Sequence, residues 1–256
     1  MSKVIVCMPA YRAATTLAKT LEALPAGTAD EILVVDDASP DDTVAVAQGL
    51  GLPTVVHPVN RGYGGNQKTC YDEALKRGGD IIVLLHPDFQ YDPGSVPALI
   101  EPLMHGHADF TFGSRFAGGR DPRHGGMPMY RYVGNRVTTG IENMVLGTHF
   151  TELHSGLKAY TRHFLESIDY HAYSDDFVFD SQMVIEAIRR GVRITEVPIP
   201  TRYADDSSSV SVTRSMKYIF ETLVCLWQTD ARLRREGAEW SSSPFLNRQG
   251  RKETGG

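Results

Sequence analysis

Strand-like apolar runs alternate with helical patterns along the first 115 residues, and this alternation limits the possible folds more than any other feature. The apolar runs cover Val4–Met8, Glu31–Val35, Thr54–His57, Asp80–Leu85 and Asp109–Phe112. Helical patterns between them include Ala14–Leu24 and Thr43–Leu50. Alternating strands and helices predict βαβ units, whose right-handed crossovers give a parallel sheet with helices on both faces. The sequence therefore predicts an α/β fold with a mostly parallel central sheet.

The alternation stops after Arg115. A loop rich in Gly, Pro, Arg and His follows at Phe116–Met129. The later elements that we predict are a helix at Tyr130–Leu146, a helix at Asp180–Arg190, a strand at Arg193–Pro198 and a helix at about Val212–Arg235. We expect one domain over residues 1–235 and a polar, disordered tail over 236–256.

The composition favours a globular enzyme. With 41% hydrophobic and 22% charged residues among 256, the chain can bury a full core. A net charge of -5 and a pI near 6.0 argue against general nucleic-acid binding. The three cysteines are widely spaced, no signal-peptide pattern is present, and no apolar run reaches the roughly 18 residues that span a bilayer. We therefore expect a cytoplasmic protein with, at most, peripheral contact at the inner face of the membrane.

Polar and aromatic residues stand directly after the first two predicted strands. Pro9 is expected to end the first strand, and Tyr11 could offer its ring or hydroxyl to a nucleobase. Asp36 and Asp37 follow the second strand, where they could accept hydrogen bonds from ribose hydroxyls or a base imino group. Helix capping is the alternative role for the polar residues that come next, Ser39, Asp41 and Asp42.

A glycine-rich turn at Asn60–Lys68 opens a predicted helix. Glycines there would let backbone N–H groups come close to a phosphate. Gln67 stands where the dinucleotide-binding fingerprint requires its third glycine, so that fingerprint is a poor match.

The motif His86–Gln90 follows the fourth predicted strand. Because Pro87 favours an extended backbone at His86, the side chains of His86 and Asp88 should project toward one ligand. A divalent cation held by Asp88, with Gln90 or water completing its shell, would neutralise a departing nucleotide diphosphate. His86 is then either a ligand that suits Mn²⁺ better than Mg²⁺, or a hydrogen-bond partner of the ribose or of a neighbouring side chain. A site that binds nucleotide without catalysis is a third alternative.

Six motifs occur in the order typical of family 2 glycosyltransferases with the GT-A fold. They are Pro9–Tyr11, Val35–Ser39, Asn60–Gly62, His86–Gln90, Gly113–Arg115 and Ser155–Tyr160. Over roughly residues 3–225 the chain most resembles the dolichyl-phosphate mannose synthase and polyprenyl-phosphate glycosyltransferase branch. The resemblance implies a Rossmann-like GT-A sheet flanked by helices, a donor half over about 1–115, an acceptor half over about 116–235, and a C-terminal helical extension.

The resemblance also implies roles for individual residues. It places the donor nucleotide beside Pro9, Tyr11, Asp36, Asp37, Arg61, Gly62, Lys68, His86 and Asp88. The metal-binding D-x-D segment of the family reads here as His86 and Asp88 followed by Gln90, so these three would bind Mn²⁺ or Mg²⁺. The diphosphate or the acceptor would contact Arg115, Arg131, Ser155 and Arg202. For the arginines of the long loop, a solvated charged surface is the alternative.

The implied reaction is an inverting displacement at the anomeric carbon of a UDP- or GDP-sugar. Candidate general bases are Glu152, which matches the acidic residue before the family's Ser-Gly, and Asp176 and Asp180. For Asp175 and Asp176, helix capping is the alternative. A polyprenyl (dolichyl-type) phosphate is the first acceptor to consider, because its second pKa near ~6 leaves it ionised at neutral pH. A hydroxyl of a soluble glycan or small molecule would need a base.

Apolar residues recur at helical spacing from Met216 to Trp227, ahead of a basic segment that contains Arg232, Arg234 and Arg235. This stripe could face a membrane, the core of the chain or a partner in a homodimer. Two other function classes stay open. One is a sugar nucleotidyltransferase, although Met8–Arg12 lacks the glycines of that class, and the other is a non-catalytic nucleotide-binding module.

Overall fold

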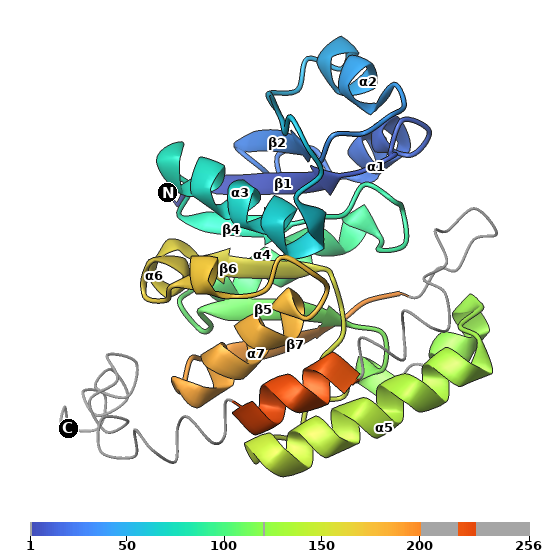
Figure 1. Ribbon diagram of the computed structural model, residues 1–256, viewed down its shortest axis with the longest axis vertical. Coiled ribbons are helices and arrows are strands. Elements are labelled where there is room, and N and C mark those ends of the chain that lie inside the picture. Colours follow the sequence, from blue (N-terminus) through green and yellow to red (C-terminus); the bar gives the residue numbers. More distant parts are fainter. Residues whose placement is uncertain (1, 120, 201–219, 229–256) are drawn as a thin grey trace.

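A seven-stranded sheet forms the centre of the computed structural model, which describes residues 2–119, 121–200 and 220–228 (Figure 1). The strands are β1 (Val4–Ala10), β2 (Glu31–Asp36), β3 (Thr54–Val56), β4 (Ile81–Leu84), β5 (Phe110–Ser114), β6 (Lys158–Thr161) and β7 (Ile194–Pro198). The helices are α1 (Leu17–Ala23), α2 (Thr43–Gly49), α3 (Gly62–Lys76), α4 (Val96–Met104), α5 (Met129–Leu146), α6 (Arg162–Glu166) and α7 (Phe179–Arg189). Short 3-10 helices lie at Pro93–Ser95, Ala117–Gly119, Pro122–Gly125 and Tyr170–Ala172.

The strand order is β3-β2-β1-β4-β6-β5-β7, and only β6 runs antiparallel to its neighbours. The mostly parallel sheet that the sequence predicts is therefore confirmed, but β6 was missed. This strand has four residues and carries Lys158, so neither its length nor an apolar pattern distinguishes it from a loop. Because Lys158 pairs with Leu84, the residues just before β6 lie at the carboxyl end of β4. That pairing brings Ser155 and Gly156 to the same edge of the sheet as His86.

The prediction that Pro9 ends the first strand is wrong, because β1 continues to Ala10. Pro9 pairs with Val35 of β2, whereas the ladder to β4 ends with the bond from the Leu85 N–H to the Cys7 carbonyl. Proline lacks an N–H and is tolerated where a strand has lost a neighbour on one side. The strand can therefore extend past the β4 ladder and carry Tyr11 beyond the edge of the sheet.

Helices cover both faces of the sheet (Figure 1). Alternate residues of β1 belong to different cores, with Ile5 and Cys7 on the face of α3 and α7, and Val6 and Met8 on the face of α1 and α4. A strand buried on both faces needs apolar residues at every position, which is why β1 reads as a continuous apolar run. The same constraint explains why the sequence predicts β2 and β4 well.

The helical residues 220–228 pack beside α7 and the end of α5 (Figure 1). Cys225 and Leu226 are buried against Val178 and Ile185, whereas Phe220 and Trp227 are exposed. Leu223 and Leu226 of the predicted apolar stripe therefore belong to the core of the chain. Met216 and Ile219 lie outside the described residues. Among the residues that the structure describes, no helix is long and apolar enough to cross a membrane.

Gly64 and Gly140 give a matched test of the packing at α3. A methyl group on Gly64 would lie 2.5 Å from the Ser174 carbonyl oxygen and 2.8 Å from Cβ of Phe179, whereas one on Gly140 meets nothing within 4 Å. We expect Gly64→Ala to lower the free energy of unfolding by about 1–3 kcal/mol in a urea titration. The control, Gly140→Ala, should raise it by about 0.5–1 kcal/mol through helix propensity. A Gly64→Ala variant as stable as the control would contradict this packing.

Candidate active site

Three strands of the sheet end in backbone conformations that side chains rarely adopt. Among the described residues, the only non-glycine residues with positive φ are Arg12 at 55°, Ala38 at 55° and Phe89 at 59°. Each stands just after the carboxyl end of a strand, respectively β1, β2 and β4. Such conformations cost free energy and occur mostly at functional sites, where the surrounding structure enforces them. The edge where these strands end is therefore the candidate site.

Asp36 is fully buried at the end of β2. Its Oδ2 accepts a hydrogen bond of 2.9 Å from the Ser39 N–H, whereas Oδ1 has no hydrogen-bond partner among the described residues. The Ser39 hydroxyl in turn accepts a bond from the Arg12 N–H at 3.0 Å, and this bond connects the loops after β1 and β2. A buried carboxylate oxygen without a donor is unusual, because burial removes its bonds to water without replacing them. Asp36 can therefore accept one more hydrogen bond from a ligand that approaches this edge.

Asp37 has protein partners for both of its carboxylate oxygens. Oδ1 lies 2.8 Å from His57 Nδ1 and accepts the Arg61 N–H at 2.8 Å, and Oδ2 accepts the Gly62 N–H at 3.0 Å. These bonds hold the loop from β3 to the first turn of α3 against the end of β2. The adjacent carboxylates that look equivalent in the sequence therefore differ, and Asp37 has a structural role here. Contact of Asp37 with a nucleoside stays a prediction.

The glycine-rich turn of α3 does not present its N–H groups to a phosphate, contrary to our expectation. The N–H groups of Gly64 and Gly65 donate to the Asp175 carbonyl at 2.8 and 3.3 Å. Lys68, one turn later, is buried and donates to the Asp175 carboxylate at 2.7 Å and to the His171 carbonyl at 3.3 Å. The glycines allow close approach, as predicted, but the group that approaches is the segment before α7. Lys68 reads as part of that contact, and its role toward the donor stays a prediction.

His86 and Asp88 are partly buried at the end of β4. Burial lowers the pKa of the His86 imidazole, and the nearby Lys158 adds to this effect while Asp88 and Asp180 oppose it. Burial also raises the pKa of the Asp88 carboxyl, partly offset by His86 and by the Gln90 N–H, which donates to Oδ1 at 3.0 Å. Both groups are therefore held in an environment that disfavours their charged forms. A bound cation would reverse that preference at Asp88.

His86 contacts a buried polar network. The Tyr63 hydroxyl lies 3.2 Å from His86 Nε2 and donates to Asp180 Oδ2 at 2.7 Å. Lys158 of β6 forms an ion pair of 2.9 Å with Asp180 Oδ1, and the Gln67 amide donates to the same oxygen at 3.2 Å. Burial lowers the pKa of the Lys158 ammonium, which Asp180 partly offsets. Asp180 is the centre of this network, and its role as a base stays a prediction.

Sequence reasoning missed Tyr63 and Lys158. Tyr63 stands among glycines, and nothing in that turn indicates a bond to a residue 117 positions away. Lys158 gives a weak signal, because a lysine beside Leu157 and Ala159 can be buried only if a carboxylate reaches it. The sequence does not indicate which carboxylate that is.

Glu152 is fully buried and forms an ion pair with Arg115. The Arg115 backbone N–H donates to Oε2 at 2.8 Å, and its guanidinium binds both carboxylate oxygens, with Nε at 2.9 Å from Oε1. The Asn135 amide of α5 donates to Oε1 at 2.9 Å. This carboxylate therefore fixes the loop after β5 to α5. Arg115 and Glu152, predicted for separate roles, act here on each other.

The remaining predicted residues lie in different places. Ser155 is buried next to Gly156, whose N–H donates to the Tyr91 hydroxyl at 2.8 Å. The Asp176 carboxylate accepts the Phe177 N–H at 2.8 Å before α7, whose N-cap residue is Val178, with no side-chain cap. The Arg131 guanidinium is on α5 and donates to the hydroxyl of Tyr130 at 3.2 Å. Arg202 lies outside the described residues.

The metal ligands that the sequence predicts are His86, Asp88 and Gln90. Among the described residues, no group of three or more His, Cys, Asp or Glu could hold a metal ion. A carboxylate at Asp88 and an imidazole at His86 are nevertheless a suitable start for a cation that takes its other ligands from a nucleotide diphosphate and water. The two side chains therefore fit a metal that binds together with nucleotide.

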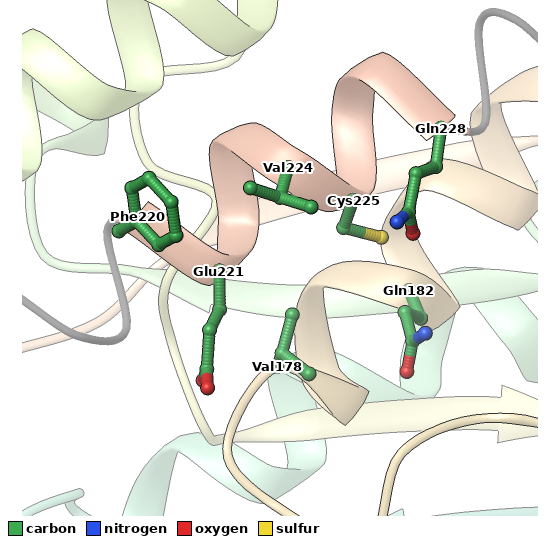
Figure 2. Close-up of a pocket in the computed structure, with 7 residues that line it drawn as sticks. All are labelled: Val178, Gln182, Phe220, Glu221, Val224, Cys225 and Gln228. Atoms are coloured by element: carbon green, nitrogen blue, oxygen red, sulfur yellow. The ribbon is translucent and has the colours of Figure 1, made fainter.

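A hollow between α7 and residues 220–228 lies apart from this edge (Figure 2). Val178, Val224 and Cys225 line it together with the polar ends of Gln182, Glu221 and Gln228. None of the residues expected to bind donor or metal is among them. Because this hollow contains none of the predicted donor or metal residues, the candidate active site is defined by the functional groups at the edge of the sheet.

Comparisons with known proteins identify the family of the chain. The family described as "Glycosyl transferase family 2" matches residues 5–169. An undecaprenyl-phosphate mannosyltransferase of Micrococcus luteus is 30% identical over 204 residues, 77% of this chain and 82% of that protein. A polyprenol monophosphomannose synthase of Mycolicibacterium smegmatis is 34% identical over 175 residues, 66% of this chain and 65% of that protein.

Among solved structures, the glucosyl-3-phosphoglycerate synthase of Mycobacterium tuberculosis in complex with Mn²⁺, UDP and glucosyl-3-phosphoglycerate is similar. It has a TM-score of 0.66 at 20% identity, and the match covers 89% of this chain and 79% of that one. This likeness confirms the GT-A fold that the sequence predicts. Together, the family match and the relatives establish that the chain belongs to glycosyl transferase family 2.

Proposed function

We propose that the chain transfers a sugar from a nucleotide-diphospho sugar to a polyprenyl phosphate, with inversion at the anomeric carbon. One observation supports a polyprenyl phosphate as the acceptor. Glu152 and Asp180, two of the three expected bases, are buried in ion pairs with Arg115 and Lys158. An acceptor that is already ionised needs no base, and a phosphate meets that condition near neutral pH. Relatives named for polyprenol and undecaprenyl phosphates support the same choice.

The donor binds at the edge formed by β1, β2 and β4. Asp36 offers its unpartnered Oδ1 to an N–H or hydroxyl of the nucleoside, and Tyr11, with 49% of its surface exposed, offers a ring face to the base. Pro9, Arg61 and Gly62 shape the backbone around these two side chains. Ligands of open α/β sheets bind outside the carboxyl ends of the strands, where all these residues lie.

Asp88 and His86 hold a divalent cation, Mn²⁺ or Mg²⁺, together with the diphosphate of the donor. When bound, the cation supplies charge neutralisation at the leaving group. The positive φ of Phe89 turns the chain directly after Asp88, so Gln90 can reach the same region. Because the protein supplies few of the ligands, we expect the affinity for the metal to depend on bound nucleotide.

The acceptor phosphate oxygen forms a bond to the anomeric carbon while the bond from that carbon to the donor diphosphate breaks. Attack from the face opposite the leaving group inverts the configuration. The chain holds the two reactants in line, which by itself removes much of the entropic cost of the reaction. Gly156 lies beside His86, and we expect Ser155 and Gly156 to contact the transferred sugar or the acceptor.

Transfer of label into a lipid tests the proposed acceptor directly. Purified protein is incubated with Mn²⁺, polyprenyl phosphate in detergent, and radiolabelled UDP-glucose, UDP-N-acetylglucosamine or GDP-mannose. We expect one donor to label the organic phase, with a loss of at least about 100-fold in rate for Asp88→Asn because the leaving group loses its neutralising charge. Asp72→Asn, at a carboxylate bonded to Tyr170 and His171, is the control and should retain the rate. Label that appears only in a soluble acceptor contradicts the lipid acceptor.

Glu152→Gln distinguishes a structural carboxylate from a general base. Because Gln removes the fully buried charge that pairs with the Arg115 guanidinium, we expect the free energy of unfolding to fall by about 3–5 kcal/mol in a urea titration. Glu101→Gln, on the exposed side of α4, should change it by less than about 0.5 kcal/mol. A Glu152→Gln variant of full stability whose kcat falls more than about 100-fold would show that Glu152 is the base.

A further inference from the structure

We infer that Tyr63 and Asp180 hold His86 in the tautomer that carries its hydrogen on Nε2, which leaves Nδ1 as the ring nitrogen that can bind a metal. Neither Tyr63 nor Asp180 touches the donor in this account, so both are positioning residues. The tautomer follows from contacts of the protein alone. Its use toward a metal rests on the proposed function.

The hydrogen of the Tyr63 hydroxyl decides the tautomer. A hydroxyl has one hydrogen. The Tyr63 oxygen lies 2.7 Å from Asp180 Oδ2, to which it donates, and 3.2 Å from His86 Nε2. Asp180 can only accept, because it is a carboxylate with the Lys158 ammonium and the Gln67 amide at its other oxygen. The Tyr63 hydrogen therefore points to Asp180. Its oxygen accepts, and the hydrogen between Tyr63 and His86 belongs to Nε2.

The packing around the ring favours the same assignment. The Tyr63 ring is stacked on His86, with centroids 5.3 Å apart and planes 7° from parallel, and Phe177 packs on Tyr63 at 4.6 Å. A methyl group on Gly156 would lie 3.2 Å from His86 Cδ2 and 3.3 Å from Nε2, so the backbone of Gly156 covers that edge of the ring. Nδ1 is on the opposite edge of an imidazole. Among the described residues, none forms a hydrogen bond with it.

Lys158 connects the contact between Tyr63 and His86 to the central sheet. Its ammonium forms an ion pair of 2.9 Å with Asp180 Oδ1, and it sits on β6, the strand that pairs with β4 directly before His86. A histidine that binds a metal through one nitrogen commonly donates from the other to a fixed partner, which sets the tautomer and the orientation of the ring. Here a tyrosine, oriented by a buried ion pair, takes the place of that partner.

Nitrogen NMR of the protein without metal or nucleotide reads the tautomer directly. In protein labelled with ¹⁵N at histidine, the two-bond ¹H–¹⁵N correlation pattern of each ring shows which nitrogen carries the hydrogen, and His86→Gln identifies the His86 signals. We expect His86 to show only the Nε2–H pattern. In Tyr63→Phe, which keeps the stacked ring but removes the hydroxyl, the pattern should change to a mixture of both tautomers.

A matched control separates this effect from the loss of any buried hydroxyl. Tyr170 also donates a 2.7 Å bond to a carboxylate, that of Asp72. Because Asp72 lies later on α3 than Tyr63, Tyr170→Phe should leave the His86 signals unchanged. Thermal unfolding of each variant verifies that it is folded. An Nδ1–H pattern or a mixture in the unaltered protein overturns the inference, as does an unchanged Nε2–H pattern in Tyr63→Phe.

The affinity for a metal tests separately whether His86 uses this tautomer to bind one. The affinity for Mn²⁺ in the presence of UDP or GDP, measured by the electron paramagnetic resonance of free Mn²⁺, should fall by 10- to 100-fold in Tyr63→Phe. Tyr170→Phe should match the unaltered protein. If the tautomer is as inferred but Mn²⁺ does not bind, then the metal site of the proposed function is wrong while the assignment of the hydrogen stands. If Mn²⁺ binds equally to Tyr63→Phe, His86 does not use this arrangement toward a metal.

Discussion

The buried ion pair between Lys158 and Asp180 is the interaction on which the candidate site depends. Lys158 lies on β6, Asp180 opens α7, and the donors Tyr63 and Gln67 come from α3, so one carboxylate connects the sheet with two helices. A buried charge that loses its partner typically costs about 3–5 kcal/mol. The antiparallel strand, the first turn of α3 and the start of α7 must therefore form together. His86 contacts this network through the Tyr63 hydroxyl.

The acidic residues at the edge of the sheet fall into two groups. Asp37, Glu152 and Asp180 are engaged by protein donors, and each joins segments that are far apart in the chain. Asp36 has an unpartnered buried oxygen, and Asp88 sits where burial raises its pKa. Carboxylates of the first group join segments of the fold. Those of the second group are the ones that we propose for the donor and the metal.

Much of the fold follows from the sequence because strands covered on both faces need unbroken apolar runs. This holds for β1, β2 and β4, and it places Asp36 and Asp88 at a common edge. It fails for β6, whose four residues include a charge, and for Pro9, which stays in its strand because β4 has already ended there. Such features depend on neighbours in space, and neighbours in space are not visible in a local pattern.

The candidate site was predicted at the level of motifs and less well at the level of single residues. Adjacent aspartates after β2 have different roles because His57 and the N–H groups of Arg61 and Gly62 reach only Asp37. The glycines of α3 were correctly read as a point of close approach, but the Asp175 carbonyl occupies the position that we expected for a phosphate. These outcomes were decided by contacts between residues that are far apart in the chain, such as His57 with Asp37 and Gly64 with Asp175.

A thermal-shift panel tests the central claim, that Asp88 and His86 form a two-ligand metal site completed by the donor. UDP-, GDP- and dTDP-sugars are each added with and without Mn²⁺ or Mg²⁺. Because binding to the native state stabilises it, a ligand at 100 times its Kd adds about 2.7 kcal/mol. We expect a clear rise in Tm only when one class of nucleotide sugar and a metal are present together. An equal rise with metal alone, or with nucleotide regardless of metal, would contradict this account.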